Sequence, residues 1–262
     1  MQQSIQPSRS PTVQYVLRLA DTCLILGQRL GEWCGHAPIL EEDVALTNIA
    51  LDLIGQTRAL LTHAGQLGKS ETGGLPLHED QLAFLREERD YMNPTLVELP
   101  RGDFAFSMLR NAVVATWLRL MWESLLESTD PELAAIAGKA VKEVRYHQQH
   151  SADWVVRLGD GTIESQRRMQ NALDELWPYT AELFEDDAID IHAQTTGLGP
   201  RWSQLRAPWL AVMQKLLDEA QLLRPQETPF RSTGKIGRHS EHMGFILTQM
   251  QFLQRNYPGG QW

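Results

Sequence analysis

The amino-acid sequence predicts an all-α protein whose core is a four-helix bundle, with additional helices towards the C-terminus. Apolar residues recur every three or four positions along several long segments, which is the period of an amphipathic helix. Few segments alternate between apolar and polar residues as strands do. Two successive pairs of these segments, residues 12–66 and 104–158, also carry polar residues at matching positions. Such a weak repeat of antiparallel helix pairs is typical of a four-helix bundle.

The first helix pair is predicted over residues 12–34 and 40–66. Val13, Leu17, Ala20 and Leu24 keep the helical period in the first segment, and Gly-His-Ala-Pro at 35–38 breaks it. Acidic residues at 41–43 favour a helix start there, because negative charge is stabilised at the N-terminal end of the helix dipole. Residues 1–11 are predicted to be a flexible N-terminal arm, and residues 12–262 a single helical domain.

The second helix pair follows a long connection. Glycines and a proline predict a loop over 65–76, and a short helix over 78–91 and two turns come next. The third long helix is predicted over 104–128. The fourth begins after Asp130, a favourable N-cap, with Pro131 at its first position, and runs to about 158. The stretch 67–103 matches the single crossover of a ferritin-like fold, so the predicted core is a ferritin-like four-helix bundle.

The remainder of the chain is predicted to add three helices. Gly-Asp-Gly at 159–161 ends the fourth helix, and Thr162 can cap a fifth that reaches Phe184 with an interruption at Pro178. Two more helices are predicted over 202–222 and 237–256.

Composition favours a cytoplasmic protein. The net charge of −9 argues against nucleic acid or an anionic membrane surface as a partner. The first ten residues lack the apolar core of a signal peptide, and no stretch predicts a membrane span. Cys23 and Cys34 lie about 16 Å apart on one predicted helix, too far for a disulfide. The tryptophans are expected to be core or interface anchors: Trp33, Trp117, Trp122, Trp154, Trp177, Trp202, Trp209 and Trp262.

Four polar residues fall on the predicted apolar stripes of the long helices, in an order typical of a di-iron bundle. In such a bundle a carboxylate on one helix is followed about thirty residues later by Glu-x-x-His on the next, and the unit is repeated. The corresponding positions are Asp21, Asp52, Asn111 and Glu143. Gly55 and Tyr146 stand where the two histidines are expected. The sequence therefore predicts degenerate ligand positions that hold no metal.

A buried polar network is the first interpretation of these positions. An isolated buried charge is unfavourable, so the five polar side chains, Tyr146 included, are expected to bond to Arg or Lys partners. A second interpretation takes Glu143, His147 and His150, which share a helix face, as metal ligands. No matching histidine lies near Asp52, which favours the network.

Other polar clusters carry weaker signals. The set His239, Glu241 and His242 opens the last predicted helix without the spacing of a zinc-protease motif. It is expected to be a polar helix start packed on its neighbours, and the alternative is a surface that contacts another protein chain of a complex. Arg231, Lys235 and Arg238 precede it, so an acidic segment or a phosphate is conceivable as their partner. No nucleophile motif or glycine-rich cofactor loop is found, so no catalytic or cofactor-binding residue is predicted.

Several long strings resemble one known family. They lie at 24–38 (LILGQRLGEWCGHAP), 48–58 (NIALDLIGQTR), 142–147 (KEVRYH), 157–162 (RLGDGT), 237–244 (GRHSEHMG) and 249–255 (QMQFLQR). These strings are similar to the PaaC family, which supplies one of the subunits of the multicomponent phenylacetyl-CoA 1,2-epoxidases. The similarity covers about residues 13–262.

The resemblance implies a ferritin-like, structural subunit in aerobic phenylacetate catabolism. In these complexes a separate, catalytic di-iron subunit epoxidises the aromatic ring with dioxygen. A reductase supplies electrons from NADPH through flavin and an iron–sulfur cluster. The PaaC subunit pairs with the catalytic di-iron subunit, stabilises the complex and carries no functional iron site. The implied partners are therefore the catalytic di-iron subunit and other epoxidase subunits, with self-association possible in addition, and no cofactor is implied in this chain.

Two alternatives stay open at this point. One is a di-iron oxygenase that itself binds metal through Asp21, Asp52, Glu143 and a shifted histidine such as His147. The other is a free-standing storage protein that forms a closed cage.

Overall fold

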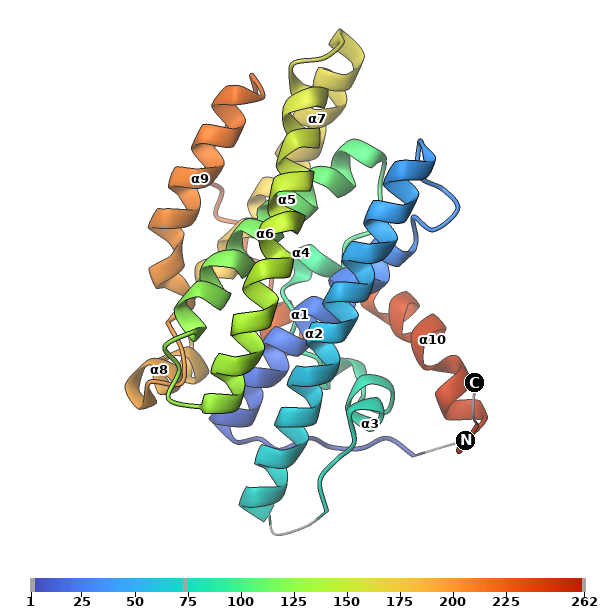
Figure 1. Cartoon of the computed structure of the whole chain (residues 1–262), viewed down its shortest axis with the longest axis vertical. Helices are drawn as coiled ribbons and strands as arrows, with labels where there is room; N and C mark the ends of the chain where they lie inside the picture. Colours follow the sequence, from blue (N-terminus) through green and yellow to red (C-terminus); the bar gives the residue numbers. More distant parts are fainter. Residues whose placement is uncertain (1–2, 73–74, 261–262) are drawn as a thin grey trace.

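The structure is a computed structural model that describes residues 3–72 and 75–260, with the backbone alone for residues 70–72. Over these ranges every regular element is a helix, which confirms the predicted all-α class (Figure 1). The α-helices are α1 Pro11–Gly31, α2 Leu40–Thr72, α3 Glu79–Phe84, α4 Thr95–Glu98, α5 Phe104–Leu125, α6 Pro131–Gly159, α7 Ile163–Leu176, α8 Ala188–Thr196, α9 Arg206–Glu219 and α10 Glu241–Asn256. Short 3-10 helices are η1 Glu88–Asp90, η2 Trp177–Phe184, η3 Trp202–Leu205 and η4 Gly234–Ile236.

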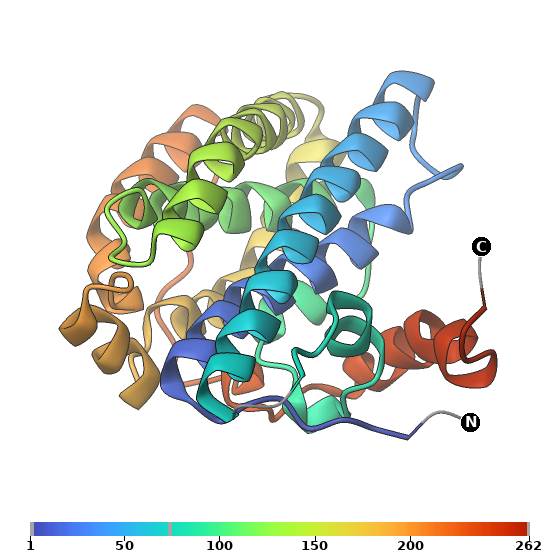
Figure 2. The same ribbon diagram turned by 60° about the horizontal axis from the view of Figure 1, so that its bottom comes forward.

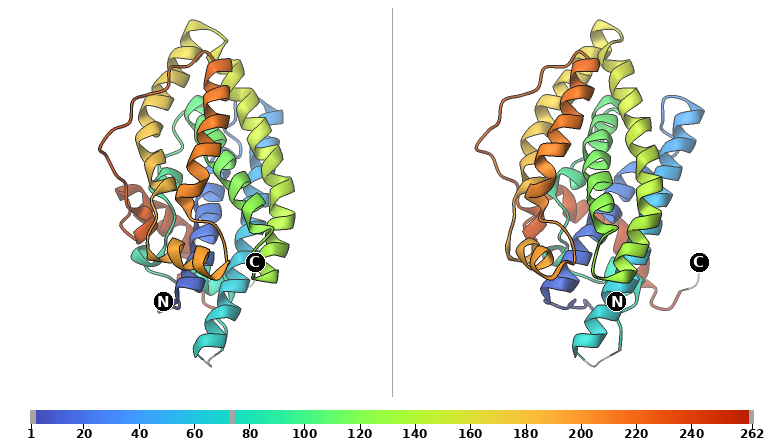
Figure 3. Two further views of the ribbon diagram at one scale, coloured as in Figure 1. Left: turned by 90° about the vertical axis from the view of Figure 1, so that its left-hand side faces the viewer. Right: turned by 60° about the vertical axis from the view of Figure 1, so that its left-hand side comes forward.

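Four long helices form two antiparallel pairs, as the sequence predicts. The pairs are α1 with α2 and α5 with α6, and α2 packs beside α6 to join them (Figures 1 and 2). The crossover from α2 to α5 carries α3, η1 and α4. The helix α5 is apolar on nearly all sides, and it is enclosed because α7 and α9 cover the side that α6 leaves open (Figure 3).

Helix starts follow the capping residues that the sequence offers. The Asp130 carboxylate accepts hydrogen bonds from the backbone N–H groups of Glu132 and Leu133, and Pro131 opens α6. The Thr162 hydroxyl accepts from the N–H of Ser165 at the start of α7. The predicted interruption at Pro178 is also confirmed, since α7 ends at Leu176 and continues as η2.

The predicted loop over 65–76 is wrong up to residue 72, because α2 continues to Thr72. The glycine at 65 serves packing rather than a turn. A Cβ added there would lie 2.1 Å from the carbonyl oxygen of Leu77, so only glycine lets the returning chain pass so close to the helix. The glycines at 73 and 74 lie outside the described residues.

Three other helix predictions need correction. The segment 78–91 is divided into α3 and η1, and the last helix begins at Glu241 rather than at 237. The segment 202–222 begins as η3 and becomes helical at Arg206, because Pro208 is tolerated only in the first turn of a helix. The helix α8 was not predicted, although Asp187 caps it and Gly197 ends it with a φ of 73°.

Residues 3–10, predicted as a flexible arm, run as extended chain along the α3 and η1 region. The N–H of Ile5 donates to the carbonyl of Leu85 at 3.0 Å, and the Arg9 guanidinium lies 2.9 Å from the Asp90 carboxylate. Helix α1 follows directly at Pro11.

The tryptophans lie mostly in the core, as predicted. Buried positions are Trp33, Trp117, Trp122, Trp177, Trp202 and Trp209, and Trp154 is partly buried. Trp262 lies outside the described residues. Both cysteines are free, as their separation predicts.

The segment after α9 is tied into the bundle by buried charges. The Lys235 ammonium donates to the carboxylate of Asp190 at 2.6 Å and lies 3.9 Å from the centre of a Trp202 ring. Arg18 of α1 contacts the same carboxylate at 3.2 Å. Arg231 pairs with Glu185. For Arg231 and Lys235, the acidic partner foreseen for this basic loop is therefore supplied by the chain itself.

Candidate functional site

Asp21, the first of the predicted ligand positions, is fully buried in an ion pair with Arg86. A second contact joins Arg86 Nη1 to Asp21 Oδ2 at 3.0 Å, and the N–H of Met92 donates to the same oxygen at 2.9 Å. The Arg86 guanidinium also lies 4.1 Å from the centre of the Tyr91 ring. The carboxylate of Asp21 is thus neutralised from the crossover segment, which is the arginine partner that the polar-network interpretation expects.

Glu143 is bonded on the other side of α1. Gln56 donates from Nε2 to the Glu143 carboxylate at 2.9 Å, and the Cys23 thiol donates to the Gln56 carbonyl oxygen at 3.6 Å. Lys139 lies 3.6 Å from Glu143 one turn earlier on α6. Burial raises the pKa of the Cys23 thiol, and the negative charges of Glu143 and Asp21 add to this effect. The thiol is therefore a hydrogen-bond donor rather than a nucleophile or a metal ligand.

Asn111 lies on α5 and is buried, but it does not join this network. Its side-chain nitrogen and oxygen have no hydrogen-bond partner among the described residues. An amide in this place offers neither the charge nor the two oxygens of the carboxylate that a di-iron site uses.

The predicted buried stripe is wrong for Asp52, Gly55 and Tyr146. The Asp52 side chain is 38% exposed, Tyr146 is 51% exposed, and Gly55 is exposed on the outer side of α2. The buried residue of this part of α6 is His147, whose Nε2 donates to Asp52 Oδ2 at 2.9 Å. The single network predicted for these positions is instead several separate contacts.

Helices α2 and α6 are held together by three histidine–carboxylate pairs. These pairs are His147 with Asp52, His150 with Glu42 at 2.8 Å, and His63 with Asp130 at 2.7 Å. Burial lowers the pKa of His147, although the hydrogen bond and charge of Asp52 act in the opposite direction. Each histidine faces its own carboxylate, so the predicted metal ligands Glu143, His147 and His150 do not converge on one point.

The outer face of α2, which the sequence reasoning missed, is apolar and exposed. We define it by Leu40, Val44, Leu51 and Ile54, with Tyr146 of α6 beside it. The spacing of four, seven and three residues places these side chains on one side of the helix. Contiguous apolar surface of this kind marks a site of interaction with another molecule.

Gly55 lies within this outer face and has no packing reason inside the chain. A Cβ added at position 55 would meet no atom within 4 Å, so any residue could stand there without a clash. Glycine in the middle of a helix costs about 1 kcal/mol relative to alanine. A smooth surface at this point therefore serves a contact outside the described part of this chain.

His239, foreseen as part of a polar helix start, is buried against the crossover. Its Nδ1 lies 2.7 Å from Glu98 Oε2, and its Nε2 lies 2.9 Å from the carbonyl oxygen of Tyr91. Both acceptors require an N–H, so the imidazole is in its doubly protonated, charged form. Burial by itself would lower the pKa of His239, but the hydrogen bond and the charge of Glu98 outweigh it, and the pKa is raised.

The raised pKa of His239 predicts a loss of stability at alkaline pH. The unfolded histidine titrates near pH 6.5, so the stabilising contribution is complete below that value and is lost as the pH rises through the higher folded pKa. Urea unfolding at a series of pH values is expected to show a free energy that falls above about pH 6.5. His239→Gln should flatten this slope, and an unchanged slope in that variant would contradict the assignment.

The residues at the predicted ligand positions do not match a di-iron centre. Gly55 and Tyr146 supply no imidazole, the Asp21 carboxylate is occupied by Arg86, and Asn111 replaces a carboxylate. Among the described residues, no three His, Cys, Asp or Glu side chains are grouped so that they could hold a metal ion. Likewise, in residues 3–72 and 75–260 no helix has both the length and the apolar character required to cross a bilayer.

Comparisons with known proteins agree over almost the whole chain. The family model described as "Phenylacetic acid catabolic protein" matches residues 1–262. The C-type subunit of 1,2-phenylacetyl-CoA epoxidase from Escherichia coli (strain K12) is 49% identical over 249 residues, which are 95% of this chain and 98% of the relative.

Proposed function

The chain belongs to the phenylacetic acid catabolic protein family, and from this premise we propose that it is the non-catalytic structural subunit of a phenylacetyl-CoA 1,2-epoxidase. Its role would be to pair with, and to stabilise, the catalytic di-iron subunit. The di-iron centre would belong to that partner, and flavin, the iron–sulfur cluster and the NADPH site to a reductase.

The observation that carries the proposal is the outer face of α2, with Gly55 at its centre. This helix face lies where a catalytic relative would direct its second carboxylate and histidine inward. Here the same stretch of helix turns Leu51 and Ile54 outward, and the position of a ligand histidine is a glycine. A specific interface needs about 800 Å² from each partner, and an apolar helix face of about 20 Å can form its centre.

Pairing is tested by producing the catalytic subunit with and without this chain. We expect a soluble mixed complex of defined size when both are present, and an insoluble or inactive catalytic subunit when this chain is omitted. Light scattering of the purified complex measures its size. A catalytic subunit that is soluble and fully active on its own would argue against a structural role.

The chain alone is expected to bind iron far below stoichiometry. The reason is the donor set, which lacks both histidines and one carboxylate and commits Asp21 to Arg86. Purified chain is incubated with Fe(II) and oxygen, and its iron content and absorption spectrum are measured. The catalytic subunit, treated in the same way, is the positive control.

One observation favours the alternative of an oxygenase in its own right. Asp52 and His147 are in direct contact, and the Glu143 charge acts on the same histidine. About two irons per chain, together with oxo-bridged absorption, would establish that function and exclude the proposed one.

A further inference from the structure

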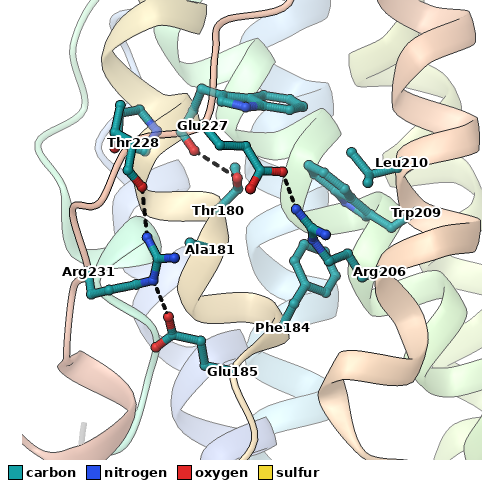
Figure 4. A pocket seen from close by; sticks show the side chains of 12 residues that line it. Thr180, Ala181, Phe184, Glu185, Arg206, Trp209, Leu210, Glu227, Thr228 and Arg231 are labelled. Atoms are coloured by element: carbon teal, nitrogen blue, oxygen red, sulfur yellow. Dashed lines mark hydrogen bonds and ion pairs between the residues drawn. The ribbon is translucent and has the colours of Figure 1, made fainter.

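A pocket on the α9 side of the bundle lies apart from the positions discussed above (Figure 4). It is enclosed by η2, α9 and the irregular segment 220–233, and its volume is about 310 Å³. This space is larger than a single aromatic ring with a short side chain needs. The pocket has an aromatic floor and a charged mouth, and each part selects one feature of a ligand.

The floor consists of Trp177, Phe184 and Trp209. The Trp209 ring centre lies 5.6 Å from that of Trp177 and 5.0 Å from that of Phe184, with the rings tilted against each other. The indole N–H of Trp209 donates to the carbonyl of Val113 at 3.0 Å, which fixes the ring. What the floor offers a ligand is therefore flat aromatic surface, and another aromatic ring is the group that packs best against it.

The mouth of the pocket carries two arginine–glutamate pairs. Arg231 lies 2.5 Å from Glu185 and also donates to two backbone carbonyls, those of Thr228 and Phe230, so its place is firmly set. Arg206 of α9 has Glu227 as its partner.

Glu227 is the weaker of the two carboxylate partners. Its side chain is 70% exposed and it stands on the irregular segment, without a helix to hold it. Exposed ion pairs contribute at most about 1 kcal/mol. The Glu227 carboxylate can thus leave Arg206, whose planar guanidinium then offers two parallel N–H groups to another carboxylate.

We propose that this pocket binds a small aromatic carboxylate of the size of phenylacetate. The ring packs on Trp209 and Phe184, and the carboxylate takes the place of Glu227 on Arg206. A thioester of the same acid lacks the negative charge and is bound weakly. The site lies in a chain without a proposed catalytic role, and it stands or falls independently of pairing with a catalytic partner.

The test is calorimetric titration of the full-length chain with phenylacetate, with phenylacetamide and acetate as comparison ligands. We expect saturable binding of phenylacetate and affinities for phenylacetamide and acetate that are about tenfold lower or less, because one lacks the charge and the other the ring. Arg206→Gln should weaken phenylacetate binding by about tenfold or more. Glu227→Gln should strengthen it several-fold, because the competing carboxylate is gone.

The control variant is Arg167→Gln, which removes an exposed, ion-paired arginine on α7 that does not line the pocket. It should bind phenylacetate as the unaltered chain does, and thermal unfolding verifies that all variants are folded. Three results would overturn the proposal: no saturable binding by the unaltered chain and Glu227→Gln, equal binding of phenylacetamide, or undiminished binding by Arg206→Gln.

Discussion

Replacement of Arg86 by methionine is expected to lower the free energy of unfolding by about 3–5 kcal/mol, because it leaves the Asp21 carboxylate buried without a counter-charge. Both side chains are fully buried, so water cannot take over the role of the guanidinium. The variant also loses the contact with the Tyr91 ring. Urea unfolding of the purified chain measures the effect, and the thermal midpoint should fall by about 10 °C.

The matched control for this prediction is the double variant Asp21→Leu, Arg86→Met. It removes both charges and fills the space with apolar atoms, so it should recover a large part of the lost stability. A double variant that is less stable than Arg86→Met alone would show that the unpaired carboxylate is not the cause.

Charged substitutions on the outer face of α2 are expected to abolish stable pairing with the catalytic partner. The double variant Leu51→Asp, Ile54→Asp places two carboxylates at the centre of the proposed interface, where burial without a partner weakens binding by about a hundredfold or more. Both side chains face solvent in the isolated chain, so its own stability should change by only about 0.5 kcal/mol for each substitution. Copurification and calorimetry measure the pairing.

Two further variants separate an interface from a general effect of charge. Ile163→Asp alters a residue that is 89% exposed on α7 and should leave pairing intact. Gly55→Ala should stabilise the isolated chain by about 1 kcal/mol, because alanine favours the helix, and yet weaken pairing. If the α2 double variant pairs as tightly as the unaltered chain, the interface lies elsewhere.

The helix pairs and their caps could be predicted because they depend on local patterns. The antiparallel pairs, Asp130, Thr162 and the break at Pro178 all follow from residue types within a few positions. The orientation of α2 could not be predicted in this way. This helix is apolar on an inner stripe that includes Leu46 and Leu53 and again on its outer face, so periodicity alone does not decide which stripe is buried. Asp52 lies between the two stripes.

The partners of the buried charges were also beyond the reach of local patterns. Asp21 finds Arg86 across the crossover, and Glu98 finds His239 near the end of the chain. Spacing along a helix cannot reveal such contacts, because they depend on how the crossover and the C-terminal segment fold back onto α1. The sequence did show the missing histidines at Gly55 and Tyr146, since an absence within a repeated motif is a local feature.

The charges that tie the C-terminal segment into the bundle also determine the order in which the protein can mature. Glu98 and Asp190 are buried, and their partners His239 and Lys235 are made last on the ribosome. N-terminal parts of a chain begin to fold while synthesis continues. Until the last segment is released, however, these two carboxylates would have to be buried without these cations, which disfavours closure of the bundle around them. The nascent chain therefore stays open until translation ends, and the cell's proteases can distinguish an unfinished copy from a complete one.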